Sequence, residues 1–430
     1  MKVVNLRKED WEKDPYLLRV KNRGFEFEEE YLNSVWEIIK NVRKFGQKAI
    51  FEYAKKFDKA DLDENNVLVS KKEIEEALNL VSKDILKALE FAAERIRKFH
   101  EEEKERSFFI EEDNGNILGQ KVLPLEKVGL YVPGGKAIYP SSVLMNAIPA
   151  KVAGVKELIV ITPVKEDGKV NPFVLAACYI AGVDKIYKVG GVHGVAALAL
   201  GIPPFPKVDK IVGPGNIYVA LAKKLLYGIV DIDMIAGPSE ILVISDEKEY
   251  VDYIAADLLS QAEHDELAAA FFVTPDENLA YKVREKVYEF ANTLERKDII
   301  LKSLQNWGYI FITYDLKHAC KVSNEIAPEH LEVLIKNPFE VLGYLRNAGA
   351  IFLGPYTCEA LGDYVLGPNH VLPTGGSARF YSPLGVYDFI KRSSIMFVTK
   401  EGFEEVADKA ITLANCESLT AHALSVKVRK

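Results

Sequence analysis

Apolar positions in the first 120 residues follow the period of an α-helix. The clearest series has an apolar side chain at every third or fourth position: Ile74, Leu78, Val81, Ile85, Leu89, Ala92, Ile96 and Phe99. This spacing collects apolar side chains on one helix face and leaves the charged ones on a solvated face. We expect one long helix here, within a mainly helical region, 1–120, that packs on the rest of the chain.

From about residue 128, short β-branched runs alternate with helix-length segments. The runs are 158–161, 185–187, 210–212 and 241–244, followed by 271–273, 309–312, 331–334 and 350–353. This alternation is typical of parallel sheets with helices on both faces. We therefore predict an α/β protein with two doubly wound parallel-sheet domains, 121–245 and 246–380.

Beyond residue 380 the strand pattern fades, and Phe403 to Leu424 has the pattern of helices. The tail, 381–430, has too few apolar positions for a core of its own. We expect it to dock on another surface.

Charge and hydropathy exclude two classes of partner. The 430 residues include 63 acidic and 55 basic side chains spread along the chain, for a net charge of -8, so there is no basic stripe for nucleic acid. No apolar stretch is long enough for a signal peptide or a membrane-spanning helix. We expect a cytoplasmic protein with no nucleic-acid or membrane partner.

The cysteines argue against a thiolate metal site. The four of them, Cys178, Cys320, Cys358 and Cys416, lie far apart and form no C-x-x-C pair. A metal would therefore need nitrogen and oxygen ligands, for which the chain offers seven histidines.

Gln261 and His264 follow an amphipathic helix that the apolar positions predict over 251–259. Their spacing of three residues places both side chains on neighbouring faces, where two ligand-capable groups converge. An ordinary helix end with polar residues is the alternative.

Glu329 and His330 stand side by side after Pro328, which ends a helical pattern just before a predicted strand. A carboxylate beside an imidazole can activate water and carry protons near neutral pH. A solvent-exposed turn is the alternative.

Asp363 and His370 lie in a segment rich in Gly and Pro, 362–370, after the strand that ends at Leu353. Loops at the carboxyl ends of parallel strands commonly build sites in α/β proteins, so we expect this segment at that edge. Asp363 is a candidate oxygen ligand or an ordinary turn former.

The segment Gly213-Pro214-Gly215-Asn216 follows a predicted strand and opens a helix, as a dinucleotide fingerprint does, but Tyr218 stands where the third glycine would be. A phosphate or ribose contact here would use helix N-terminal amides and Asn216. The segment 132–135 is similarly loop-like.

Together these segments resemble the histidinol dehydrogenase family. The matching strings run in order through most of the chain: GLYVPGGKAIYPSSVLM (129–145), GPGN (213–216), AGPSE (236–240), SQAEHD (260–265), APEHLE (327–332), GDYVLGPNHVLPTGG (362–376), SPLGVYDF (382–389) and ESLTAH (417–422). The resemblance implies an aldehyde-dehydrogenase-like pair of α/β domains with small helical appendages, and a homodimer with active sites shared between chains.

The resemblance also implies a ligand set. The zinc ligands would be Gln261, His264, Asp363 and His422, which also contact L-histidinol, and His422 would come from the partner subunit. Further substrate contacts would be Ser239, His330, His370 and Glu417, the last also from the partner.

The implied reaction oxidises L-histidinol twice, through histidinal to L-histidine, with two NAD. His330 would take the alcohol proton, and Glu329 would activate water to attack the aldehyde. The domain 121–245 would bind NAD and 246–380 would carry the metal and catalytic residues, while the tail would dock on the partner subunit.

NAD contacts would come from Tyr131, His193 and Asn216. The chain departs from the family at His193, where glutamine is usual, and at Ser418, where glycine is usual. A serine can cap the helix expected from about Leu419.

Two other hypotheses for the function remain. An ordinary aldehyde dehydrogenase would need a cysteine nucleophile, for which Cys358 and Cys416 are the candidates. A metal-binding or nucleotide-sensing protein without turnover would not need the Glu329 and His330 pair.

Overall fold

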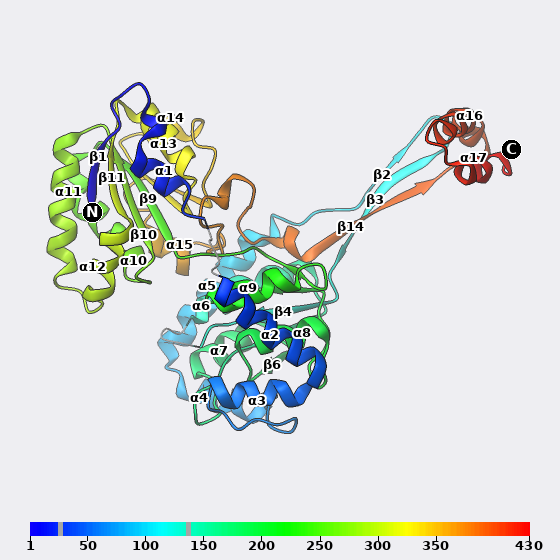
Figure 1. Cartoon of the computed structure of the whole chain (residues 1–430), viewed down its shortest axis with the longest axis horizontal. Helices are drawn as coiled ribbons and strands as arrows, with labels where there is room; N and C mark the ends of the chain where they lie inside the picture. Colours follow the sequence, from blue (N-terminus) through cyan, green and yellow to red (C-terminus); the bar gives the residue numbers. More distant parts are fainter. Residues whose placement is uncertain (25–28, 135–138) are drawn as a thin grey trace.

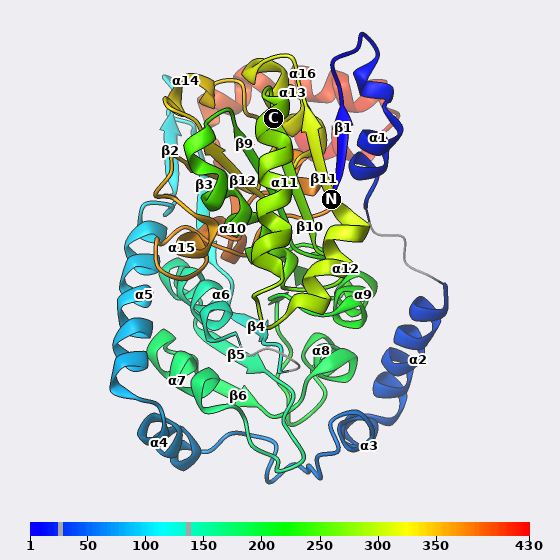
Figure 2. The same ribbon diagram turned by 90° about the vertical axis from the view of Figure 1, so that its left-hand side faces the viewer.

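The computed structural model of the chain describes residues 1–24, 29–134 and 139–430. Two parallel sheets, each with helices on both faces, confirm the predicted α/β class, and a third, antiparallel sheet projects from them (Figures 1 and 2). Among the described helices, none combines the length and the apolar character that crossing a bilayer requires.

The five-stranded sheet has the order β6-β5-β4-β7-β8 with parallel neighbours. The chain moves outward from β4 in one direction and returns to add β7 on the other side, so the strand order reverses between β4 and β7. Helices α6 and α7 cover one face and α8 and α9 the other (Figure 2). The elements are β4 (Lys127–Tyr131), α6 (Pro140–Ala153), β5 (Glu157–Ile161), α7 (Pro172–Ala181), β6 (Lys185–Tyr187), α8 (Gly191–Leu200), β7 (Lys210–Val212), α9 (Ile217–Leu226) and β8 (Asp231–Ile232).

Four N-terminal helices pack around this domain: α2 (Glu29–Phe45), α3 (Gln47–Phe57), α4 (Lys71–Leu80) and α5 (Lys83–Glu101). The single helix expected over 74–99 is wrong. Val81 adopts an extended conformation, and the hydroxyl of Ser82 accepts a hydrogen bond from the backbone N–H of Ile85 at 3.4 Å, which starts α5. The apolar period continues across the break because both helices face the same core.

The six-stranded sheet has the order β1-β11-β10-β9-β12-β13, again with parallel neighbours. Its strand order reverses between β9 and β12. Helices α10, α11 and α12 cover one face, and α1 and α13 the other. The elements are β1 (Lys2–Asn5), α1 (Pro15–Lys21), β9 (Glu240–Ser245), α10 (Val251–Ala262), β10 (Ala269–Thr274), α11 (Glu277–Ala291), α12 (Lys297–Trp307), β11 (Gly308–Ile312), α13 (Leu316–Ile326), β12 (His330–Leu334), α14 (Phe339–Leu342), β13 (Ala350–Leu353) and α15 (Glu359–Tyr364).

Strand pairing differs from the predicted ranges at two places. β1 lies in the region 1–120 yet forms the edge of the six-stranded sheet, and β9 lies in the range 121–245 yet pairs with β10 and β12. The second domain therefore begins before β9 and also recruits the N-terminus of the chain.

The third sheet forms an arm of three antiparallel strands in the order β14-β3-β2. The strands are β2 (Phe108–Glu111), β3 (Ile117–Pro124) and β14 (Ile390–Phe397), and the arm carries α16 (Lys400–Cys416) and α17 (Thr420–Lys427) at its far end (Figure 1). The tail 381–430 is therefore not purely helical as expected.

The expected cap by Ser418 is also wrong. Leu419 precedes α17 and no side chain caps this helix, while Ser418 itself has a φ of 61°. This left-handed conformation favours glycine because it crowds a Cβ atom.

Candidate active site

Glu329 and His330 lie at the amino end of β12, where it runs between β9 and β13. α13 ends at Ile326, Ala327 follows with a φ of 50°, and Pro328 prevents the helix from continuing. The turn leaves both side chains buried, with 7% of Glu329 and 3% of His330 exposed. The predicted pair is thus in the interior and not in a solvent-exposed turn.

The peptide groups of Glu240, at the start of β9, hold both side chains. The N–H of Glu240 donates to Oε2 of Glu329 at 2.7 Å, and Nδ1 of His330 lies 2.9 Å from the carbonyl oxygen of Glu240. A carbonyl only accepts, so Nδ1 carries the proton, and in the neutral ring Nε2 is the acceptor. Nε2 has no hydrogen-bond partner among the described residues and lies 3.6 Å from Oδ1 of Asp363.

Asp363 reaches this place because α15 runs back along β12. The N–H of Glu359, at the start of α15, donates to Oε1 of Glu332 within β12 at 2.7 Å, and Asp363, one turn later, is beside His330 at the start of the strand. The expectation of a site at the carboxyl ends of these strands is wrong. The site lies at their amino ends, at the position where the strand order reverses.

His370 joins the site from the loop after α15. Its Nδ1 donates to the carbonyl oxygen of Asp363 at 2.9 Å, and its Nε2 lies 3.4 Å from the hydroxyl of Ser142. Ser142 is in the first turn of α6, the helix that follows β4 in the five-stranded domain. The site therefore lies where the two domains meet.

Gln261 and His264 approach from the end of α10. Gln261 is fully buried, and neither atom of its side-chain amide has a hydrogen-bond partner among the described residues. Burial lowers the pKa of His264, and the negative charge of Asp363 partly offsets this effect. Burying amide atoms without hydrogen bonds costs free energy, so the side chain of Gln261 is a candidate to bind a ligand or metal.

The pKa values of Glu329 and His330 are shifted by burial and by the charge of neighbouring side chains, including each other. Burial raises the pKa of Glu329 to about 8, against the attraction of His330. Burial by itself lowers the pKa of His330, but the carboxylates of Glu329 and Asp363 outweigh it and raise this pKa to about 10. Strongly shifted groups beside a pocket are typical of active sites.

Glu359 is a site residue that the sequence reasoning missed. His330, Glu359 and Asp363 each offer a ligand atom within 4.8 Å of the others. Glu359 also accepts a hydrogen bond from the hydroxyl of Ser260 at 2.7 Å. Glu359 and Asp363 are four residues apart on one helix, and this spacing could have indicated that both carboxylates lie on the same face.

A cavity of about 310 Å³ opens at this cluster. His330, Asp363 and His370 line it together with apolar side chains such as Phe99 of α5 and Leu366, and no cysteine is among its lining residues. This counts against a thiol nucleophile. Cys358 precedes α15 and Cys416 is exposed on the arm.

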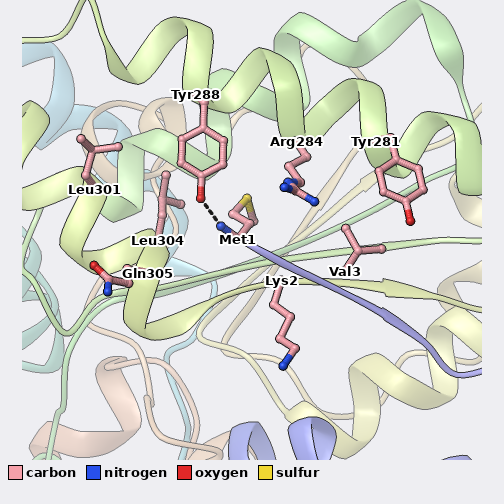
Figure 3. Close-up of a pocket in the computed structure, with 9 residues that line it drawn as sticks. All are labelled: Met1, Lys2, Val3, Tyr281, Arg284, Tyr288, Leu301, Leu304 and Gln305. Carbon is pink, nitrogen blue, oxygen red and sulfur yellow. Dashed lines mark hydrogen bonds between the residues drawn. The ribbon is translucent and has the colours of Figure 1, made fainter.

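A wider surface hollow of about 700 Å³ lies beside the edge strand β1, where the amino group of Met1 donates to the hydroxyl of Tyr288 (Figure 3). None of the predicted site residues lines it.

Of the remaining predicted substrate and metal residues, one lies at the site and two lie far from it. Ser239 directly precedes β9 and so lies next to Glu240. Glu417 and His422 are exposed at the end of α16 and on α17, at the far end of the arm (Figure 1). One chain alone does not bring these two residues to the site.

The predicted NAD residues surround the point where the strand order of the five-stranded sheet reverses. Tyr131 ends β4, and Asn216 caps α9 by accepting hydrogen bonds from the N–H groups of Tyr218 and Val219 at 3.1 and 3.2 Å. Gly213, with a φ of 111°, packs so closely on Tyr131 that a Cβ atom would lie 2.3 Å from its carbonyl oxygen. Gly135 and residues 136–138 of the matching strings lie outside the described residues.

A buried ion pair holds the Gly213 turn. Lys223 and Asp233 contact each other, with 4% and 1% of their side chains exposed. The Lys223 ammonium donates to the carbonyl oxygen of Gly213 at 3.0 Å, and Asp233 accepts from its N–H at 2.8 Å. These contacts hold the turn in place.

His193 lies in the first turn of α8 with 2% of its surface exposed. It packs against Tyr53 and Phe57, and its Nε2 is 3.9 Å from Asp58. Neither ring nitrogen has a hydrogen-bond partner among the described residues. Burial lowers the pKa of His193 to about 4 and raises that of Asp58 to about 6.

A buried acid and base at a pocket between two doubly wound domains define the chain as an α/β enzyme. The family model for histidinol dehydrogenase matches residues 21–430. The chain is 59% identical over 430 residues to a histidinol dehydrogenase of Aquifex aeolicus (strain VF5), with 100% of both chains covered, and 52% identical to one of Clostridium acetobutylicum, with 97% and 96% covered. The chain belongs to the histidinol dehydrogenase family.

A solved structure agrees with this assignment. The crystal structure of histidinol dehydrogenase from Elizabethkingia anophelis matches with a TM-score of 0.93 at 37% identity, covering 100% of this chain and 98% of that one.

We predict that His193→Gln makes stability less dependent on pH. Unfolded His193 takes up a proton below about pH 6.5, but the folded side chain stays neutral down to about pH 4. The stability of the original protein therefore falls as the pH drops through this window, by about 2 kcal/mol at pH 5 relative to pH 8. Asp58 is present in both proteins, so its titration largely cancels.

Urea unfolding of both proteins at pH 5 and pH 8 measures this effect. The variant should gain stability relative to the original protein at pH 5. An equal difference between the two proteins at both pH values would contradict the prediction.

Proposed function

We propose that this protein oxidises L-histidinol to L-histidine through histidinal, as a zinc-dependent enzyme that uses two NAD and acts at the end of histidine biosynthesis in the cytoplasm. The observation that carries the proposal is the buried Glu329 and His330 pair beside a small pocket, in a chain of the histidinol dehydrogenase family. The pocket, of about 310 Å³, suits a small polar substrate.

Zinc would be held by Gln261, His264 and Asp363 of one chain and by His422 of the partner subunit. Nitrogen and oxygen donors of this kind are ordinary zinc ligands. The unpartnered buried amide of Gln261 supports the assignment, because a metal would satisfy its oxygen. When bound, zinc supplies a Lewis acid that holds and orients the amino alcohol.

NAD would bind at the carboxyl edge of the five-stranded sheet, with contacts from Tyr131, His193 and Asn216. Support comes from the reversal of strand order between β4 and β7, where doubly wound folds bind nucleotides, and from the Gly213 turn, which Lys223 and Asp233 hold by hydrogen bonds. When bound, NAD accepts one hydride in each of the two oxidations.

His330 would manage the proton of the substrate hydroxyl. Its Nδ1 proton is committed to the Glu240 carbonyl, so once the ring is neutral Nε2 is the acceptor that takes the hydroxyl proton. Asp363 lies 3.6 Å from Nε2 and stabilises the imidazolium that results. Burial keeps bulk water from competing for this proton.

Glu329 would act in the second half of the reaction. Its carboxylate removes a proton from the water that attacks the aldehyde carbonyl, and the hydrate then loses hydride and proton to give the carboxylic acid. The hydrogen bond from the N–H of Glu240 fixes one carboxylate oxygen and leaves the other for this water. Ser239 and His370, with Glu417 of the partner subunit, would hold the substrate.

The active form would be a homodimer. The arm exposes large apolar side chains on all three strands: Phe108, Phe109, Ile110, Leu118, Met396 and Phe397. An apolar surface of this kind favours burial against a partner. A second chain would cover the arm and receive Glu417 and His422 in its own site.

Metal removal tests the function directly. We predict that the protein reduces NAD when given L-histidinol, that strong chelation abolishes NADH formation, and that added zinc restores it. NADH absorbance is the measurement, with bound metal quantified in the same samples. Full turnover in metal-free protein, or no turnover with zinc present, would refute the proposal.

Glu329→Gln should separate the two oxidations. We predict a loss of about 10²-fold or more in kcat for histidinal and a much smaller loss for the oxidation of histidinol, because only the aldehyde needs an activated water. Single-turnover measurements with each substrate give the two rates. Equal losses on both substrates would argue against this role.

Mixed dimers test the shared site. Asp363→Ala and His422→Ala should each be inactive alone, but a mixed dimer contains one site with both residues intact. With random exchange, half of the dimers are mixed and half of their sites are intact, so about a quarter of the original activity should return. If mass-tagged chains exchange and activity stays at the level of the single variants, His422 acts within its own chain.

A further inference from the structure

Arg23 forms a buried ion pair with Glu240, the residue whose peptide groups hold both catalytic side chains. Nε of Arg23 donates to Oε1 of Glu240 and Nη2 to Oε2, both at 2.6 Å. Only 4% of each side chain is exposed. Gly375 adds a third bond from its N–H to Oε1 at 2.9 Å.

Arg23 also binds the other side of the catalytic pair. Nη1 donates to the carbonyl oxygen of Ile326 at 2.9 Å and to that of Val20 at 2.7 Å, and Nη2 lies 3.5 Å from the carbonyl oxygen of Ala327. Ile326 and Ala327 lead directly into Glu329. One guanidinium therefore links the start of β9 to the turn that precedes β12.

The two connections act on the same pair of side chains. From β9, the Glu240 peptide orients Glu329 and fixes the proton of His330 on Nδ1. In the turn before β12, Arg23 contacts the carbonyl oxygens of Ile326 and Ala327. These contacts fix the position of the backbone that leads to Glu329. Neither Arg23 nor Glu240 is among the residues that line the pocket, and both act on the pair through the backbone.

We propose that Arg23 and Glu240 are positioning residues that hold Glu329 and His330 in their reactive geometry. The inference rests on the proposed catalytic roles of Glu329 and His330. A buried ion pair costs much of its attraction in desolvation and contributes little net stability compared with apolar packing. Its effect here is to fix geometry. The planar, bidentate contact needs arginine, and lysine would keep the charge but lose the fork.

The test uses two conservative variants with matched controls. Arg23→Lys is compared with Arg19→Lys, which alters an arginine of the preceding helix α1. Arg19 donates to the Tyr309 hydroxyl at 2.9 Å and lies over the Trp307 ring. Glu240→Gln is compared with Glu73→Gln, which weakens another ion pair, with Lys188, in the other domain. Thermal unfolding and dimer content are measured for every variant.

In the holoenzyme, Arg23→Lys and Glu240→Gln should each lower kcat for L-histidinol by about 10²-fold, because a small misplacement of catalytic groups has this cost. KM should stay within about threefold, since the pocket wall is intact. The double variant should be no more than about twofold worse than the worse single variant, because both act through one contact. The two controls should keep kcat.

A separate signature is the tautomer of His330. ¹⁵N spectra of histidine-labelled protein, recorded at a pH where the His330 ring is neutral, should show protonation at Nδ1 in the original protein and a mixture of tautomers in Arg23→Lys. A merely structural loss would lower the folded fraction and leave the tautomer of the folded molecules unchanged.

The outcomes are distinguishable. If Arg23→Lys and Glu240→Gln keep kcat at the level of their controls, if kcat losses multiply in the double variant, or if the tautomer is unchanged, the positioning role is overturned. Glu329→Gln and His330→Gln are run in the same assay. If those two variants retain full activity, the proposed catalytic roles fail first, whatever Arg23 does.

Discussion

The proposed catalytic arrangement depends on the backbone of one residue, Glu240, which starts β9 beside the start of β12. Its N–H and carbonyl oxygen point to two different side chains of the neighbouring connection, Glu329 and His330. These contacts lie at the amino end of the sheet, so the backbone of one strand sets the orientation of an acid and the tautomer of a base.

The two domains use opposite ends of their sheets. The five-stranded sheet offers the carboxyl ends of β4 and β7, as doubly wound folds usually do, whereas the six-stranded sheet offers the amino ends of β9 and β12. In both sheets the position is where the strand order reverses. The contact of Ser142 with His370 brings these two edges together. A nucleotide bound at one edge, as proposed, would therefore face an acid and base at the other, as hydride transfer between them requires.

Most strands of the two parallel sheets were predictable from the sequence, although β4 was missed, and the strands of the exposed arm were not. The eight strand runs were found because parallel strands covered by helices are continuously apolar. The sequence did not predict the three strands of the arm, β2, β3 and β14. The arm buries neither face within one chain, so its sequence lacks the apolar alternation of a half-buried sheet. The break between α4 and α5 escaped because both helices share one core and keep the same apolar period.

At the candidate site, the sequence predicted the residues that stand in motifs but not the residues that contact and position them. Glu329, His330 and Asp363 stand in recognisable segments, but which end of the sheet they occupy depends on the path of α15, which no local pattern encodes. Glu359 was missed although it stands four residues before Asp363 on one helix face. Arg23 lies 217 positions from Glu240 in the chain and carries no motif, so only the fold pairs them.

The exposed arm gives a physical reason for the proposed division of the active site between chains. A three-stranded sheet needs a buried apolar face to be stable, and this arm has large apolar side chains in solvent on each strand. A partner that covers the arm would stabilise it and at the same time fix Glu417 and His422 in space. If those residues complete the site of the second chain, the free energy of assembly also orders the ligand that Gln261, His264 and Asp363 lack. A monomer would then hold the acid, the base and the nucleotide turn in place and still bind the metal incompletely, so that catalysis would begin only in the dimer.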